Sequence, residues 1–178
     1  MLTNSLVISA QKHTQIALRN ILAALASLEN LNFGNSPLHQ PISELERMVT
    51  DQGYVFVGAY SADELVGYCA GSRLGNYFGR PLVSEYRLAN IPVENVIYVE
   101  SFEILPALQK KGIGASLFRD FLNHAKAKAF SHVAGHAREG ICYTTVRSIL
   151  NNKVLTDIPV ADYRGSGETY HYLLARIK

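Results

Sequence analysis

Hydrophobic positions in the first part of the chain follow a helical period. Residues 14–30 carry Leu and Ile at spacings of three and four, which predicts one long amphipathic helix. A loop rich in Gly, Pro and Asn follows, and a shorter helix is expected at residues 41–50. The apolar residues 5–10 predict a short strand before these helices.

The pattern then changes to that of strands and alternates with two further helices. Residues 54–60 and 65–74 are rich in β-branched and aromatic side chains around a polar turn, which predicts a hairpin. Further strands are expected at residues 96–105, 131–137, 154–163 and 169–177, and helices at residues 115–130 and 142–152.

The resulting element order is β-α-α-β-β-β-α-β-α-β-β. The strands at residues 96–105 and 131–137 are joined by a helix, so we expect them to be parallel with a right-handed crossover. The other strands are expected to pair mainly antiparallel. The order predicts a mixed α/β fold (α+β-like), with about seven strands and flanking helices in a single domain over residues 1–178.

Composition narrows the classes of partner. The formal net charge of +2 over 178 residues argues against nucleic acid or an anionic membrane as the main partner. No stretch is long and apolar enough for a membrane span, and no secretory signal is visible, so a cytoplasmic location is expected. His132 and His136 would lie roughly 13 Å apart on a strand, so no metal site is expected.

The segment QKKGIGA, residues 109–115, lies between a predicted strand and a predicted helix. A glycine-rich turn opening a helix points N–H groups at one place, and Lys110 and Lys111 add positive charge, which favours a phosphate. A tight turn without a ligand is the alternative. The segment lacks the Lys-Ser/Thr end of a Walker A loop, and Leu117 replaces the third glycine of a dinucleotide fingerprint.

The stretch ILPALQKKGIGASLF resembles the coenzyme loop of the GCN5-related N-acetyltransferase (GNAT) family, Q/R-x-x-G-x-G/A after a strand. The resemblance extends to the element order of nearly the whole chain. It implies an acyl-CoA N-acyltransferase fold whose fourth and fifth strands splay apart around the thioester of acetyl-CoA. It also implies coenzyme contacts from Ile104, Leu105, Gln109, Lys110, Lys111, Gly112, Ile113, Gly114 and Ala115.

Acetyl transfer to an amine needs a group that accepts the amine proton and a donor for the leaving thiolate. Glu100 and Glu103 are the carboxylates of the apolar strand at residues 96–105, and alternation places them on opposite faces. We expect Glu100 to be the base, by resemblance to the Y-x-E stretch of polyamine-acetylating members, with Glu103 second and structural pairing as the alternative. Ile149 or Leu150 stands where the resemblance implies the tyrosine that protonates the thiolate. Tyr143, earlier in the same predicted helix, is the candidate in its place. Water as the proton donor and a packing role for Tyr143 are the alternatives.

The resemblance also implies an acceptor site between two loops, residues 30–40 and 75–92. Tyr77, Phe78, Glu85 and Tyr86 would suit a cationic amine, although three arginines in the same stretch oppose that charge.

The predicted function is an acetyl-CoA-dependent N-acetyltransferase acting on a primary amine in a direct ternary complex, without a metal. The alternatives are a non-catalytic acyl-CoA-binding module of the same fold and a nucleotide-binding domain of another kind. The edge strand near the C-terminus is compatible with a homodimer.

Overall fold

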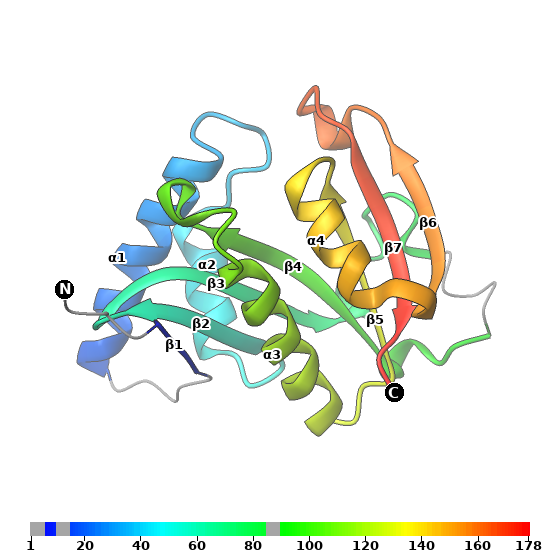
Figure 1. The fold of residues 1–178 in the computed structure, drawn as a ribbon, viewed down its shortest axis with the longest axis horizontal. Coiled ribbons are helices and arrows are strands. Elements are labelled where there is room, and N and C mark those ends of the chain that lie inside the picture. Colours follow the sequence, from blue (N-terminus) through cyan, green and yellow to red (C-terminus); the bar gives the residue numbers. More distant parts are fainter. Residues whose placement is uncertain (1–5, 10–14, 85–89) are drawn as a thin grey trace. The chain divides into compact units, whose positions relative to one another are not determined.

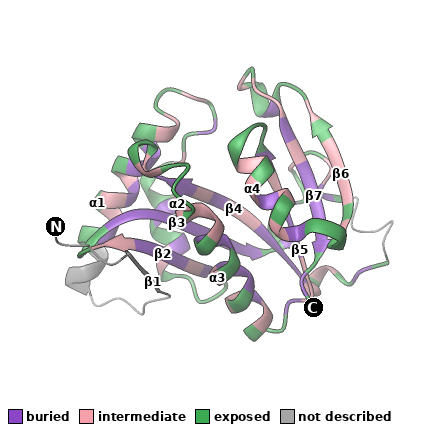
Figure 2. Ribbon diagram, in the orientation of Figure 1, coloured by how far each residue is buried: buried purple, intermediate pink, exposed green. Residues whose placement is uncertain are grey.

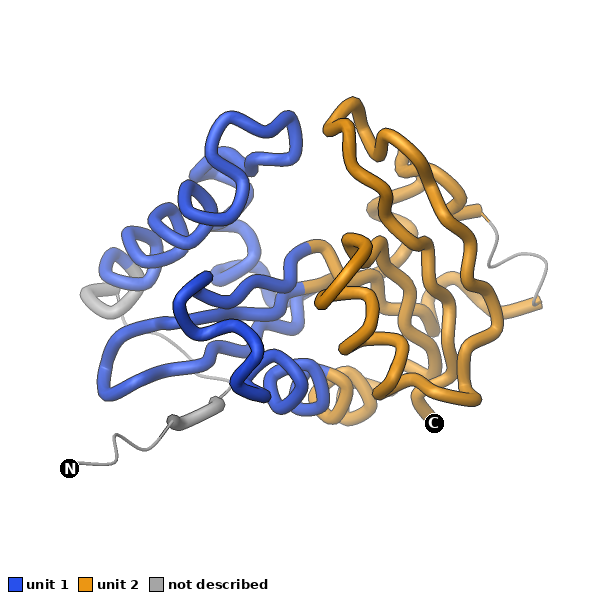
Figure 3. The backbone as a smooth tube through the Cα atoms, turned by 45° about the horizontal axis from the view of Figure 1, so that its top comes forward, with its two compact units in different colours: residues 1–70, 101–121 blue, residues 71–100, 122–178 orange. Residues whose placement is uncertain are grey.

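The computed structural model describes residues 6–9, 15–84 and 90–178, with side chains described from residue 19 onward outside 85–89. The chain forms two compact units (Figure 3). Unit 1 comprises residues 1–70 and 101–121, and unit 2 comprises residues 71–100 and 122–178. Each unit is therefore built from segments that are distant in the sequence.

The elements follow the predicted order, and Figure 1 labels them along the chain. The helices are α1 (Gln15–Asn32), α2 (Ile42–Thr50), α3 (Ile113–Ala127) and α4 (Ile141–Leu150). The strands are β1 (Leu6–Ser9), β2 (Val55–Ser61), β3 (Glu64–Arg73), β4 (Val96–Ile104), β5 (His132–Arg138), β6 (Val154–Val160) and β7 (Tyr170–Arg176). Within the described residues, no helix has the length and apolar character needed to cross a bilayer.

The strands hydrogen-bond in the order β1-β2-β3-β4-β5-β7-β6. Strand β4 pairs parallel with β5, whereas β1–β2, β5–β7 and β6–β7 are antiparallel, which confirms the mixed sheet. The register between β4 and β5 covers Val96–Val99 and His132–Gly135. This parallel pairing therefore ends before either strand ends, as the resemblance implied for the fourth and fifth strands.

The core of unit 1 forms where α1 and α2 pack against β2 and β3. The apolar stripe predicted for α1 supplies Ile21, Leu25 and Leu28, and α2 adds Leu45 and Met48. Strand β3 is buried over all but its two end residues, and Figure 2 shows it largely in the colour of buried residues. A strand with both faces covered reads as a continuous apolar run, as residues 65–70 do.

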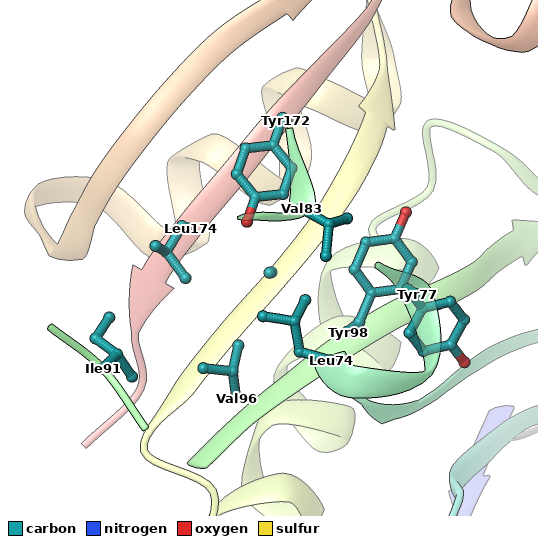
Figure 4. Close-up of a cluster of buried hydrophobic side chains, with 9 residues drawn as sticks. Leu74, Tyr77, Val83, Ile91, Val96, Tyr98, Tyr172 and Leu174 are labelled. Carbon is teal, nitrogen blue, oxygen red and sulfur yellow. The ribbon is translucent and has the colours of Figure 1, made fainter. Parts of the chain in front are cut away.

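The core of unit 2 is a separate cluster with several aromatic rings (Figure 4). Its buried members are Leu74, Tyr77, Val83, Ile91, Val96, Tyr98, Ala134, Tyr172 and Leu174. The rings of Tyr77 and Tyr98 stack with centroids 4.4 Å apart. Tyrosine brings a polar hydroxyl into a core, so each such ring needs a hydrogen-bond partner in this unit.

Candidate functional site

The glycine-rich segment of unit 1 connects the end of β4 to α3. After β4 ends at Ile104, a 3₁₀ turn at Pro106–Leu108 leads into residues 109–112, which are exposed. Helix α3 begins at Ile113, two residues earlier than the sequence predicts, so Ile113 and Gly114 belong to its first turn. The predicted coenzyme residues 109–115 thus form one continuous segment, exposed at residues 109–112 and half-buried at the helix start, residues 113–115.

Two glycines explain why the sequence adopts this turn. Gly112 has a φ of +81°, a conformation that costs a residue with a side chain about 1–2 kcal/mol. At Gly114, an added Cβ would lie 3.3 Å from Cζ of Phe102, so a larger residue would push α3 away from β4. The side-chain amide of Gln109 donates to the carbonyl of Ile104 at 3.2 Å and secures the turn from within.

The turn fits an anionic ligand. The first N–H groups of an α-helix lack partners within the helix, and the N–H of Ser116 is bonded back to the carbonyl of Gly112 at 3.1 Å. The preceding N–H groups, at residues 113–115, are therefore at the positive end of the α3 dipole. Lys110 and Lys111 are exposed beside them. A diphosphate would meet backbone donors and two cations at this turn.

The two strand-end residues predicted to accompany the pantetheine arm already use main-chain groups within unit 1. The N–H of Leu105 donates to the carbonyl of Val66 on β3 at 2.9 Å. The carbonyl of Ile104 accepts the Gln109 amide described above. A strand-like pairing with pantetheine at these residues would therefore use their remaining N–H and carbonyl groups or replace the Gln109 bond.

Glu103, on the same strand in unit 1, lies in a buried polar cluster. Its side chain is 4% exposed, and it accepts hydrogen bonds from the Tyr68 hydroxyl at 2.7 Å and the Asn32 amide at 3.0 Å. It is also hydrogen-bonded to the carboxyl group of Glu29, which is 0% exposed. The pKa of Glu103 is raised to about 9, mainly by burial and secondly by the neighbouring Glu29. Glu103 is therefore protonated at neutral pH.

Glu100, in unit 2, has partners of a different kind. Its side chain is 5% exposed, and one oxygen accepts a hydrogen bond from the Tyr77 hydroxyl at 2.6 Å. The other oxygen lies 3.5 Å from a guanidinium nitrogen of Arg80. The Tyr77 hydroxyl in turn lies 2.8 Å from Oγ of Ser72. Glu100 therefore has a guanidinium and a phenol hydroxyl as its partners, whereas Glu103 has a second carboxyl group and neutral donors.

A second polar pair in unit 2 joins β4 to β5. The hydroxyl of Tyr98 and Nδ1 of His136 are 2.7 Å apart. Burial lowers the pKa of His136 to about 4, so its ring is neutral at neutral pH. The His136 ring also stacks on Tyr163 with centroids 4.5 Å apart. His136 is thus a packed core histidine.

Tyr143, the predicted proton donor, lies on α4 in unit 2. Its hydroxyl donates to Oδ2 of Asp157 at 2.9 Å, and its ring stacks on His171 with centroids 3.8 Å apart. The bond to Asp157 raises the pKa of Tyr143. Tyr143 therefore carries its proton at neutral pH, as a general acid must.

The predicted acceptor residues differ in exposure. Tyr77 is buried against Tyr98 and bonded to Glu100, whereas Phe78, the next residue, is 50% exposed. Glu85 and Tyr86 lie outside the described residues.

Sequence reasoning missed the partners of both glutamates. Glu29 follows Leu25 by four residues on α1, so its position on the apolar stripe of the helix was a usable signal. Tyr68 and Arg80 carried no comparable signal, because their contacts to Glu103 and Glu100 join residues 35 and 20 positions apart. Within the described residues, no group of three or more His, Cys, Asp or Glu side chains could hold a metal ion.

Comparisons with solved structures agree with this fold. The structure of yncA from Salmonella typhimurium with its cofactor acetyl-CoA has a TM-score of 0.68 at 13% identity, covering 98% of this chain and 95% of that one. The ribosomal-protein-S18-alanine N-acetyltransferase from Escherichia coli has a TM-score of 0.63 at 11% identity, covering 98% and 95%. An aminoglycoside 6'-N-acetyltransferase complexed with coenzyme A has a TM-score of 0.64 at 12% identity, covering 97% of both chains.

Sequence comparison identifies the family. No curated protein matches the chain. A model of the acetyltransferase (GNAT) family matches residues 22–139, a range that includes most of α1, the glycine-rich segment and all of β5. The match covers well over half of the sequence, and the chain therefore belongs to the GNAT acetyltransferase family.

Proposed function

We propose that this chain is an acetyl-CoA-dependent N-acetyltransferase that transfers acetyl to a primary amine of a small molecule or a peptide by direct attack in a ternary complex. The observation that carries the proposal is the exposed turn at residues 109–112 that leads into the start of α3, with the N–H groups of that helix start and two lysines. Structural neighbours with acetyl-CoA or coenzyme A support the choice of ligand. We infer one acetyltransferase domain, because the family match includes parts of both units.

The coenzyme, when bound, supplies an acetyl group activated as a thioester. In this proposal the N–H groups of residues 110–115 and the ammonium groups of Lys110 and Lys111 hold its pyrophosphate. Gly112 keeps the turn in its left-handed conformation. Ile104 and Leu105 provide the main chain beside the pantetheine arm.

Glu100 is the proposed base. A carboxylate that keeps its charge can accept the proton of the attacking amine, directly or through a water molecule. Tyr77 and Arg80 fix the orientation of the carboxylate, and the acceptor must compete with Arg80 for it. Glu103 is protonated at neutral pH and is assigned a positioning role instead.

Tyr143 is the proposed donor to the departing thiolate, and in that role its hydroxyl would exchange its hydrogen bond to Asp157 for one to the thiolate. The acceptor is assigned to residues 30–40 and 75–92, with Phe78 as the exposed aromatic contact. Two structural neighbours are named N-acetyltransferases, one for the alanine of ribosomal protein S18 and one for an aminoglycoside, which supports an amine acceptor.

A non-catalytic acyl-CoA-binding module is the second candidate. Two points favour it: neither Ile149 nor Leu150, one of which stands where the resemblance implies the tyrosine, can donate a proton, and the Glu100 carboxyl group lies 3.5 Å from the guanidinium of Arg80.

Isothermal titration calorimetry with acetyl-CoA, CoA and ATP tests the coenzyme assignment. Binding of both CoA forms without ATP binding is expected, and absence of CoA binding would exclude both candidates. A thiol-release assay over polyamines, aminoglycosides, amino acids and peptide N-termini then separates them. Turnover with any amine supports the enzyme, and CoA binding without turnover across this panel supports the module.

A further inference from the structure

We propose that Glu29 and Glu103 share one proton, and that this shared proton holds residues 33–41 on β4 as a positioning device for the acceptor segment. Both carboxyl groups and all their partners named below belong to unit 1. The naming of residues 33–41 as part of an acceptor segment rests on the proposed function. The shared proton and the anchoring do not.

Burial requires a proton between the two carboxyl groups. Glu29 is 0% and Glu103 is 4% exposed, and they are hydrogen-bonded to each other. Their other described partners are neutral groups: the Tyr68 hydroxyl, the Asn32 amide and the backbone N–H of Gln40. Two adjacent ionised carboxylates without a cation would repel each other at low dielectric, so one proton between them is the stable state.

The pair contacts both ends of the connection between α1 and α2. Asn32, the last residue of α1, donates its amide to Glu103 at 3.0 Å. Gln40, two residues before α2, donates its backbone N–H to Glu29 at 2.7 Å. The Gln40 side-chain amide donates to Oγ of Ser101 on β4 at 2.6 Å. The connection is therefore fastened at both ends to one polar cluster.

The remainder of the connection is shaped by its own turns. The N–H of Ser36 donates to the carbonyl of Phe33 at 2.7 Å, and the N–H of His39 donates to the carbonyl of Ser36 at 3.0 Å. These bonds set the local shape of residues 33–39. The position of residues 33–39 relative to β4 therefore depends on the polar cluster around Glu29 and Glu103, together with the buried side chain of Leu38.

Among the titratable groups packed around Glu29 and Glu103, the glutamate pair itself is the one expected to change charge in this test. Burial and the two glutamates raise the pKa of Tyr68 well above its ordinary value, so it remains a donor. The His39 ring bonds Asn30 at 3.1 Å in an exposed position, and on α2 Glu44 pairs with Arg47. Loss of the shared proton would place two negative charges between α1 and β4, and their repulsion would loosen Gln40.

Nuclear magnetic resonance of protein labelled at glutamate Cδ and backbone nitrogen tests this between pH 5 and 10. We expect the Glu103 carbon to titrate near pH 9, where burial places its pKa. The protection factor of the Gln40 amide should fall about tenfold at the same step, the equivalent of one lost hydrogen bond. Titration of the Glu103 carbon near its ordinary pKa, or an unchanged Gln40 amide, would overturn the proposal.

Three variants keep the test decisive. Glu103→Gln mimics the protonated pair, so Gln40 should stay protected up to pH 10. Glu94→Gln, at an exposed acid, should leave the step unchanged. Ser101→Ala removes one Gln40 anchor but leaves the pair, so the carbon step should persist while Gln40 protection falls at every pH. Loss of the carbon step in Ser101→Ala would contradict the proposal.

A CoA titration of the same samples keeps this proposal separate from the proposed function. Normal CoA binding without the pH step would refute the positioning device alone. The pH step without CoA binding would refute the proposed function alone.

Discussion

Two glutamates three residues apart on β4 have opposite surroundings. Glu103, in unit 1, meets a second carboxyl group and neutral donors, and it holds a proton at neutral pH. Glu100, in unit 2, meets the guanidinium of Arg80 and the hydroxyl of Tyr77. Both side chains are nearly buried, so solvent exposure does not separate them.

The difference shows that the two glutamates are distinguished by their partners and not by burial alone. Burial penalises the charged form of any carboxyl group, and a nearby cation opposes that penalty. Of the two, Glu100 has such a cation among the described residues. A general base at neutral pH must begin in its charged form, which supports the proposed roles of Glu100 as the base and Glu103 as a positioning residue.

The largest effect is expected from removing the charge of Glu100. Glu100→Gln keeps a side chain of the same shape that can still accept the Tyr77 hydrogen bond. Because it cannot accept a proton, we expect kcat to fall roughly 100- to 10,000-fold in the thiol-release assay. Coenzyme affinity should be unchanged, since the coenzyme turn lies elsewhere on the chain. Glu103→Gln is the matched variant on the same strand. An equal loss of kcat in Glu103→Gln would contradict the proposed difference in role between the two glutamates.

The Tyr68 hydroxyl tests the unit 1 cluster through stability. Tyr68→Phe leaves an oxygen of Glu103 without its donor, and we expect the free energy of unfolding to fall by about 1–3 kcal/mol in urea. Tyr60→Phe is the control, because the buried Tyr60 hydroxyl has no hydrogen-bond partner among the described residues. Equal losses in the two variants would show that the Tyr68 bond contributes nothing specific.

The two units should also respond oppositely to pH. The folded pKa of Glu103, about 9, lies above its ordinary value of 4.5, so its contribution is complete below pH 4.5 and is lost as pH rises toward 9. The folded pKa of His136, about 4, lies below its ordinary 6.5, so its contribution is complete above pH 6.5 and is lost as pH falls toward 4. In each case the free energy of unfolding changes by at most about 1.4 kcal/mol per pH unit.

Urea unfolding across this pH range checks both signs. Relative to the wild type, Glu103→Gln should flatten the loss of stability between pH 7 and 9. His136→Gln should flatten the loss between pH 6.5 and 4. A variant that leaves its own slope unchanged would contradict the protonation state assigned to that side chain.

The smallest effect is expected at Tyr143. Tyr143→Phe removes the hydrogen bond to Asp157 but keeps the ring on His171. A thiolate leaves readily and water can protonate it, so kcat should fall less than about tenfold. A loss of a hundredfold or more would make Tyr143 an essential acid in place of an assisting one.

Local patterns predicted the fold well because strands and helices leave short-range signals. The alternation in β4 correctly placed Tyr98 and Glu100 on one face, where Tyr77 meets both, and Ser101 and Glu103 on the other, where Gln40 and Tyr68 lie. The glycines also marked the turn at residues 109–115. The start of α3 at Ile113 was missed because Gly112 and Gly114 suggested a longer turn.

The environments of the two glutamates could not be predicted in the same way. Glu29 and Glu103 are 74 positions apart, and neither the period of α1 nor that of β4 identifies the other as its partner. Arg80 lay in a stretch where acidic and basic residues cancelled, so its pairing with Glu100 required the folded chain. Protonation depends on these long-range partners, and the sequence therefore ranked Glu100 before Glu103 by resemblance alone, without access to the environment of either side chain.

Calorimetric titration of CoA into the wild type and Gly112→Ala tests the coenzyme turn most directly. The added Cβ would meet nothing within 4 Å, so its effect acts through the φ of +81° that residue 112 must adopt. Gly79→Ala is the matched control, because its Cβ also meets nothing within 4 Å, without a positive φ. We predict CoA binding by the wild type, unchanged binding by Gly79→Ala, and roughly five- to thirtyfold weaker binding by Gly112→Ala. No CoA binding by the wild type, or equal affinity in Gly112→Ala, would contradict the assignment of this turn to the coenzyme.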